Sequence, residues 1–236
     1  MEEVSYITHA LGILYPGRFL EVFMKQTRVK KLVLLAMLSA LAYVVALVFP
    51  RIEVAGFLRY EPKDVIIVMG GFMLGPLATV IISVLVAVLE MFTISDTGPI
   101  GCLMNALSSC AFALTAAIIY KKKHTLSGAI IGLTVGSIAM VAVMLLWNWI
   151  VTPWYMYVPR SKVEEMLLPI FLPFNAVKAG LNAGLTLVLY KPLTNALGKA
   201  RLLPKPASGK SSFHIWVYIA AAVLLGGCTA LLLLLF

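Results

Sequence analysis

Long apolar segments, separated by short polar ones, run through most of the chain. Six lie between residues 32 and 190, at about 32–49, 65–75, 77–94, 100–120, 126–151 and 168–190, and a seventh covers 215–236. A helix rises about 1.5 Å per residue, so most of these segments can cross a hydrocarbon core of about 30 Å. The pattern predicts an all-α, polytopic membrane bundle with a six-helix core and an additional C-terminal transmembrane helix.

The polar stretches divide the chain into four parts. We expect a cytoplasmic amphipathic segment at 1–31, a six-helix membrane domain at 32–192, a basic cytoplasmic linker at 193–214 and a further transmembrane helix at 215–236. The first segment has no small-residue cleavage site before its apolar core, so we do not interpret it as a cleaved signal peptide. Its apolar residues could form a short helix on the inner membrane surface; they are Leu11, Leu14, Phe19, Leu20 and Phe23.

The stretch 65–94 is nearly all apolar but too long for one span. Thirty residues would form a helix of about 45 Å, and Gly75-Pro76 interrupts them, which indicates a turn after a short second segment. A short segment leaves part of the membrane to be crossed by the preceding loop, 50–64. That loop mixes charges with Phe57, Leu58 and Tyr60. It could fold over a pocket, or it could be a solvated connector. We also expect a loop at 153–165.

Composition supports the membrane assignment. The chain is 61% hydrophobic and 12% charged, whereas soluble domains are about half apolar and a quarter charged. Thirteen lysines and arginines fall in 1–31, 121–124 and 191–214, and five fall in the opposite loops. The positive-inside rule therefore predicts a cytoplasmic N-terminus and an outer C-terminus in a multi-pass protein of the cell membrane. The net charge of +9 then reflects topology, and we expect no nucleic-acid partner.

The most informative polar residues lie in the sixth segment. Asn175, Lys178 and Asn182 are spaced by three and four residues and so share one helix face. Lys178 is the only lysine that we place inside the membrane, where a charge is costly and usually marks a binding site. Two other readings stay open, an ion pair with Glu90 and extension of the ammonium group toward the outer surface. Asn182 lies a turn deeper and is interpreted as a helix-packing residue.

Further polar residues collect near the outer ends of other segments. Glu90, Asn105 and Asn148 can line a pocket open to the outside, together with Asn175 and Lys178. Carboxamides with one ammonium group suit a planar, hydrogen-bonding heteroaromatic solute. No nucleophile, zinc-protease or phosphate-loop motif occurs, so we expect neither catalysis nor a metal site. Cys102, Cys110 and Cys228 are interpreted as small apolar residues.

Small residues in the first span form a face for close helix contact. Ala36 and Ala40 are four residues apart, and this face could pack within the bundle or dock onto a separate subunit. In the fifth segment, Gly128, Gly132 and Gly136 form a similar stripe.

Several segments resemble the substrate-binding subunits of energy-coupling-factor (ECF) vitamin transporters, and within these the riboflavin-specific type. The resemblance covers about 30–192 and is carried by Phe57–Asp64, Gly70–Ala78, Asn105–Ser108, Asn148–Met156 and Pro173–Lys178. It implies a six-helix bundle whose outward-facing pocket is closed by the first outer loop. It also implies docking through Ala36 and Ala40 onto a transmembrane coupling subunit driven by two ATPase subunits.

The same resemblance implies that Asn148, Asn175 and Lys178 contact flavin, and that Leu58 and Tyr60 contact its ring or ribityl chain. Riboflavin would be a transported ligand, not a cofactor. The alternatives are the same architecture specific for flavin mononucleotide or another vitamin, and a membrane scaffold without transport. The N-terminal extension and the seventh helix are not part of the family pattern.

Overall fold

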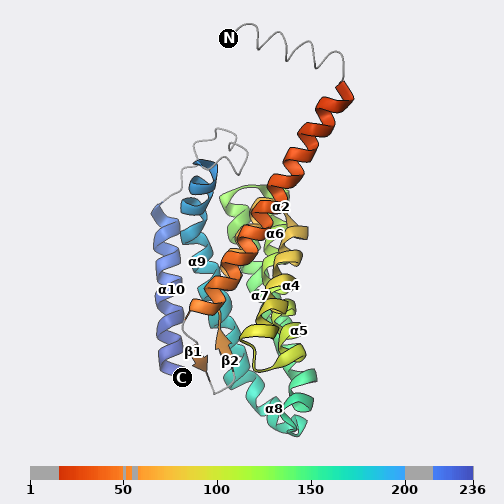
Figure 1. Ribbon diagram of the computed structural model, residues 1–236. Coiled ribbons are helices and arrows are strands. Elements are labelled where there is room, and N and C mark those ends of the chain that lie inside the picture. Colours follow the sequence, from red (N-terminus) through yellow and green to blue (C-terminus); the bar gives the residue numbers. More distant parts are fainter. Residues whose placement is uncertain (1–15, 50–51, 55–57, 200–214, 236) are drawn as a thin grey trace.

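The protein is an all-α bundle with a short β-hairpin toward one end (Figure 1). The structure is a computed structural model, and it describes residues 16–49, 52–54, 58–199 and 215–235. Two π-helical turns, Cys110–Leu114 and Leu167–Phe171, join α5 to α6 and α8 to α9. The elements are α2 (Pro16–Val48), β1 (Ile52–Val54), β2 (Leu58–Tyr60), α3 (Lys63–Leu74), α4 (Pro76–Thr93), α5 (Gly98–Ser109), α6 (Thr115–Lys123), α7 (Leu126–Met156), α8 (Arg160–Met166), α9 (Leu172–Lys199) and α10 (Ile215–Leu235).

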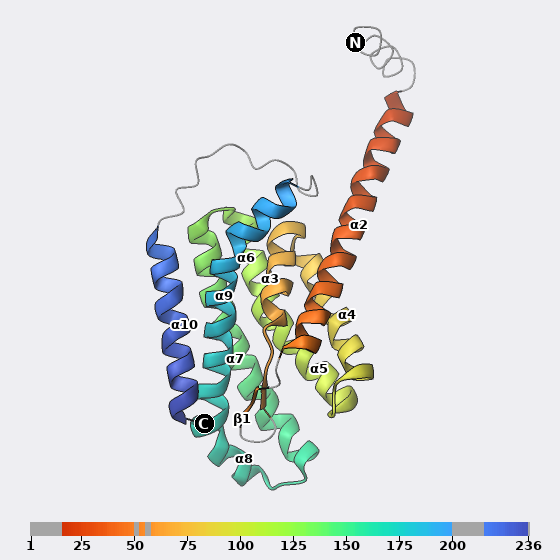
Figure 2. The same cartoon turned by 60° about the vertical axis from the view of Figure 1, so that its left-hand side comes forward.

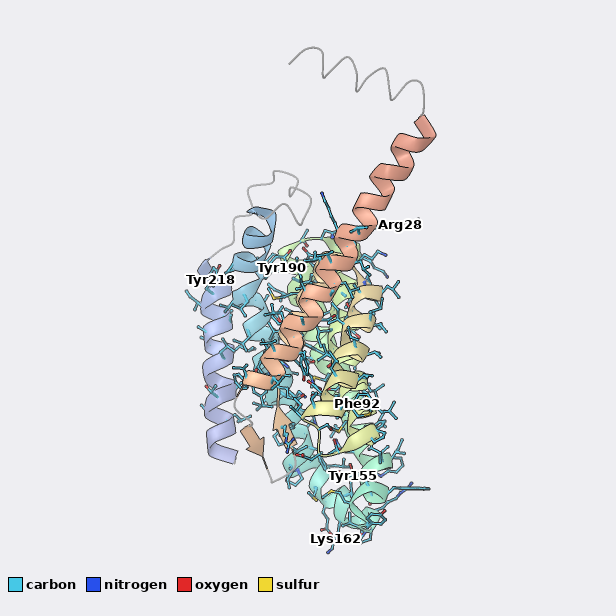
Figure 3. All side chains as sticks on the ribbon, in the orientation of Figure 1. Arg28, Phe92, Tyr155, Lys162, Tyr190 and Tyr218 are labelled. Atoms are coloured by element: carbon cyan, nitrogen blue, oxygen red, sulfur yellow. The ribbon has the colours of Figure 1, made fainter. Side chains whose placement is uncertain are left out.

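Five helical stretches of the described chain are long and apolar enough to span a bilayer. They cover residues 28–48, 76–93, 98–123, 126–156 and 160–190. Large apolar side chains point outward from them, as Phe92 does with 78% of its surface exposed (Figure 3). α10 is a further apolar helix, packed along α9. The predicted fold class, an all-α polytopic membrane bundle, is confirmed.

The predicted short segment and Gly-Pro turn are also confirmed. α3 has 12 residues, about 18 Å of helix, which is too short to cross the hydrocarbon core. Gly75 ends α3 with a φ of 97°, in the left-handed region that favours glycine, and Pro76 opens α4. The antiparallel hairpin of β1 and β2 directly precedes α3 and fills part of the depth that this short helix leaves (Figure 2).

The predicted loop at 153–165 is wrong at both ends. α7 continues through Pro153 to Met156, and α8 already begins at Arg160. A proline removes only one backbone donor from a helix, and membrane helices tolerate this where neighbouring groups compensate. The chain instead turns at Tyr157, whose φ of 54° ends α7.

The first helix also differs from expectation. α2 begins at Pro16 and runs unbroken to Val48, so residues 16–31 continue the first span and form no separate surface helix. The part of that predicted surface helix that included Leu11 and Leu14 lies outside the described residues. So does most of the predicted linker at 193–214, although α9 extends into it as far as Lys199.

Small residues set the closest helix contacts, as the sequence predicts. A Cβ atom added to Gly136 would lie 2.5 Å from the carbonyl oxygen of Phe112. The backbone of α7 at this glycine therefore packs closely against the backbone of the turn between α5 and α6. A Cβ atom on Gly180 would lie 2.6 Å from Cys228 Sγ, which brings α10 against α9. The three cysteines are free and partly buried.

The two ends of the bundle differ. α2 projects beyond one end, where Arg28 and Tyr190 also lie, and the hairpin and α8 lie toward the other (Figures 2 and 3). Tyr155 and Lys162 mark that hairpin end in Figure 3. The last residues of α10 lie toward the same end (Figure 1). Here the helix ends, the hairpin and the α4–α5 turn enclose the main cavity.

Candidate binding site

A cavity of about 410 Å³ lies between the hairpin, the end of α2 and helices α4, α5, α7 and α9. Its volume falls within the range of about 300–1,000 Å³ that is usual for small-molecule sites. Apolar walls come from Ala46, Phe49, Met144, Trp147 and Phe174. The seven residues that the sequence predicts for a binding site all line it; they are Leu58, Tyr60, Glu90, Asn105, Asn148, Asn175 and Lys178.

The hairpin forms one wall of the cavity because alternate residues of β2 pack into the bundle. Leu58 lies in an apolar cluster with Val163 and Phe171, and Tyr60 lies in a second one with Val177. The Tyr60 hydroxyl donates a hydrogen bond of 3.1 Å to Asn182 Oδ1 on α9. Of the two readings of loop 50–64, its described residues 58–62 therefore support the one in which the loop covers a pocket.

The intervening residue of β2 faces the rim. Arg59 Nη2 lies 2.6 Å from Asp96 Oδ2, which belongs to the turn between α4 and α5. Both residues line the cavity, and both side chains are partly exposed. The hairpin is thus tied to the opposite edge of the cavity by an ion pair that water can reach.

A buried ionic cluster closes the α3–α4 side. Lys63 Nζ pairs with Glu90 Oε2 and lies 2.6 Å from Glu61 Oε2. Asn105 Nδ2 donates to the same Glu90 oxygen over 3.1 Å. Burial raises the pKa of Glu61, but the positive charges of Lys63 and Lys178 outweigh it and hold this pKa below its usual value.

This cluster corrects two sequence interpretations. Lys63, which we placed in an outer loop, is only 2% exposed, so Lys178 is not the only buried lysine. Glu90 takes Lys63 as its ionic partner, and the proposed pair between Lys178 and Glu90 is wrong. The sequence signal that could have shown this is the position of Lys63 at the first turn of an otherwise apolar helix.

A second polar layer lies behind the first and was missed by the sequence analysis. Asp64 accepts hydrogen bonds from the Ser109 hydroxyl and, over 3.3 Å, from Asn182 Nδ2. Because Asn182 also binds Tyr60, it links the hairpin, α3 and α9. This agrees with the predicted packing role of Asn182.

The α7 and α9 side carries the carboxamides. Asn148 Nδ2 donates to the carbonyl oxygen of Met144 at 2.7 Å, and the Thr152 hydroxyl donates to Asn148 Oδ1 at 2.9 Å. Asn175 Nδ2 donates to the carbonyl oxygen of Phe171, at the π-helical turn before α9. These bonds fix both side chains along the cavity wall.

Lys178 differs from every other cation of the site. Its side chain is 7% exposed, and among the described residues it makes neither a hydrogen bond nor an ion pair. Its ammonium group is therefore available to a ligand, with three donors. A planar ligand could place a polar edge with carbonyl oxygens against Lys178 and the two carboxamides. Its apolar ring would then contact the apolar walls.

Comparison with known proteins decides the family. Residues 30–190 match the family described as the ECF transporter, substrate-specific component. The chain belongs to this family. The matched range contains α3 to α7 and every residue that lines the cavity, whereas α10 lies outside it.

Two relatives of this S component are transporters for a known solute. The riboflavin transporter RibU of Staphylococcus aureus (strain TCH60) is 30% identical over 176 residues, which cover 71% of this chain and 92% of RibU. The riboflavin transporter FmnP of Bacillus subtilis (strain 168) is 28% identical over 161 residues, or 64% of this chain and 85% of FmnP.

A solved structure has the same fold. The S component of a bacterial ECF transporter superposes with a TM-score of 0.61 at 30% sequence identity, and the match covers 72% of this chain and 98% of that one. The S-component bundle therefore accounts for nearly all of that protein, while this chain carries additional segments.

Proposed function

We propose that this S component captures riboflavin from outside the cell and delivers it to an ECF transport complex. The observation that carries the proposal is one cavity under a hairpin that joins apolar walls, two fixed carboxamides and the buried ammonium of Lys178, which has no hydrogen bond or ion pair with the described residues. Relatives that transport riboflavin support the choice of solute. Another vitamin would need a different set of polar groups, and a scaffold would have no need of a preformed cavity.

The proposed chemistry is binding without catalysis. The flavin ring system is planar. Its faces suit apolar walls, and one edge carries alternating carbonyl oxygens and nitrogen atoms. Asn148 and Asn175 would pair with that edge, and Lys178 would donate to a carbonyl oxygen. Leu58 and Tyr60 would cover the ligand from the hairpin, and Glu90 and Asn105 would face it from α4 and α5.

The proposed orientation places the cavity at the outer side of the membrane. The excess of lysine and arginine at the opposite end, including Lys121–Lys123 at the end of α6, supports a cytoplasmic N-terminus. An outer C-terminus would follow, because α10 ends toward the same end of the bundle as the hairpin (Figure 1).

Absorbance of the purified protein tests the proposal. After expression with added riboflavin, we expect a yellow chromophore that copurifies at about one flavin per chain, as a single site requires. A folded preparation without flavin absorbance, from cells grown in the same medium, would contradict it.

The docking face can be tested separately. Ala36 and Ala40 are exposed on the outer side of α2, next to the exposed Met37. We propose that this face contacts the transmembrane coupling subunit, which two ATPase subunits drive.

Ala40→Trp should reduce riboflavin uptake by cells by about tenfold or more, because an indole side chain prevents close helix approach. Binding by the purified variant should stay within about twofold of wild type, since Ala40 does not line the cavity. Loss of binding instead would place this face in the ligand site.

A further inference from the structure

The C-terminal helix α10 lies outside the family match, yet it packs closely along α9 (Figures 1 and 2). Two glycines of α9, four residues apart and so on one helix face, leave room for it. A Cβ atom on Gly180 would lie 2.6 Å from Cys228 Sγ, and one on Gly184 would lie 3.0 Å from Leu225. A Cβ atom on Gly226 of α10, in contrast, would meet no atom within 4 Å. One defined face of α10 is therefore turned toward α9, in a small-residue contact typical of membrane helices.

The face of α10 that contacts α9 also reaches the hairpin. Leu225 and Cys228 are three residues apart, and both pack against the apolar cluster of Tyr60, Val177 and Leu181. Of these three clustered residues, only Tyr60 lines the cavity. No described residue of α10 lines it. An effect of α10 on a ligand must therefore pass through its neighbours, and Tyr60 is the neighbour that reaches the cavity.

Tyr60 is held by contacts from three helices. Its hydroxyl donates to Asn182 Oδ1 on α9, and its ring meets that of Phe49, just after α2, edge to face with 5.8 Å between the centroids. Leu225 and Cys228 of α10 supply the third contact. The side chain is only 5% exposed as a result. Because β2 ends at Tyr60, restricting this side chain also restricts the hairpin that covers the cavity.

We propose that α10 is a positioning element of the binding site, which holds Tyr60 and the hairpin over bound riboflavin and so slows its release. The inference rests on the proposed riboflavin function and adds to it, since the family-matched bundle would hold Tyr60 from α2 and α9 alone. A ligand leaves a covered cavity when the cover moves, and this movement separates Tyr60 from Leu225 and Cys228. The contact with α10 therefore raises the barrier to release.

The test compares two leucines of α10 by the rate of riboflavin release. Purified protein loaded with riboflavin is diluted rapidly, and release is followed by flavin fluorescence. Leu225→Ala should speed release by about three- to tenfold, because it removes the apolar contact with the Tyr60 cluster. Leu231→Ala is the matched control, since Leu231 is 43% exposed and lies outside the cluster, and its release rate should stay within about twofold of wild type. Equal rates for the two variants would overturn the inference and leave the proposed function intact.

The route through Tyr60 is tested by repeating the comparison in a Tyr60→Ala background. There Leu225→Ala should change the release rate by less than about twofold, because the contact that it weakens is already absent. An acceleration as large as in the wild-type background would show that α10 acts on the bundle as a whole. That result would overturn the inference, since a general loss of stability does not depend on Tyr60.

A smaller substitution decides the inference if Leu225→Ala does not fold. Cys228→Ala removes one sulfur atom from the same contact and should speed release by about two- to threefold. Cys102→Ala is its control, because Cys102 is also partly buried but lies on α5 and does not line the cavity. Equal release from the two cysteine variants would contradict the inference alone. If the folded wild type bound no riboflavin, the inference and the proposed function would fall together.

Discussion

Lys178→Ala is expected to weaken riboflavin binding by about 10- to 100-fold while the protein still inserts and folds. The variant removes a charge-assisted hydrogen bond, which contributes about 1.5–3 kcal/mol. Folding should persist because Lys178 lines the cavity and makes no hydrogen bond or ion pair with the described residues. Fluorescence titration of the purified variant with riboflavin measures the effect.

Lys162→Ala is the matched control for this experiment. Lys162 is an exposed lysine at the same end of the bundle, and it does not line the cavity (Figure 3). The Lys162→Ala variant reports any general effect of removing one positive charge from that end of the bundle. Its affinity for riboflavin should equal that of the wild type. Unchanged affinity in Lys178→Ala would show that the lysine serves the fold instead of the ligand.

Lys63→Met is expected to lower the free energy of unfolding by about 3–5 kcal/mol, the usual effect of leaving a buried charge without its partner. The variant keeps the apolar stem but leaves Glu61 and Glu90 without the ammonium that joins them. Thermal unfolding in detergent, followed by circular dichroism, measures the loss.

The double variant Lys63→Met with Glu90→Gln separates charge from packing. It removes one of the two stranded carboxylates, so it should unfold at a higher temperature than Lys63→Met alone. A double variant that is no more stable than the single one would mean that Lys63 acts through its shape. Lys63 and Lys178 are thus expected to give opposite results, one mainly on stability and the other mainly on binding.

Periodicity and turn chemistry were enough to predict most of the fold. The Gly75-Pro76 turn and the short α3 follow from residue types whose backbone preferences are strong. Local signals failed where tertiary contacts override them. We expected a loop from residue 153, yet α7 continues through Pro153 to Met156, and Thr152 and Pro153 are themselves buried against the bundle.

Five cavity residues were predicted because each is a polar group in an apolar segment, where its presence needs a reason; they are Glu90, Asn105, Asn148, Asn175 and Lys178. Leu58 and Tyr60 were predicted only from the family resemblance.

Lys63 and Asp64 were misplaced because they lie in a charged stretch that looks like a solvated loop. Only the three-dimensional pairing of Lys63 with Glu90, and of Asp64 with Ser109, shows that this stretch is folded inward. Ser108, which also lines the cavity, belongs to the Asn105–Ser108 segment that carries the family resemblance, but no role of its own was predicted from the sequence.

The central claim is that the cavity under the hairpin binds riboflavin, and two variants of α2 test it most directly. Ala46 lines the cavity, whereas Ala40, on the same helix, is exposed on the outside. Purified wild type, Ala40→Trp and Ala46→Trp would each be titrated with riboflavin, after size-exclusion chromatography shows that all three are monodisperse. Wild type and Ala40→Trp should saturate at about one flavin per chain, and Ala46→Trp should show no saturable binding, because its indole occupies the cavity. Riboflavin binding by Ala46→Trp at wild-type affinity would show that the flavin lies elsewhere and would contradict the claim.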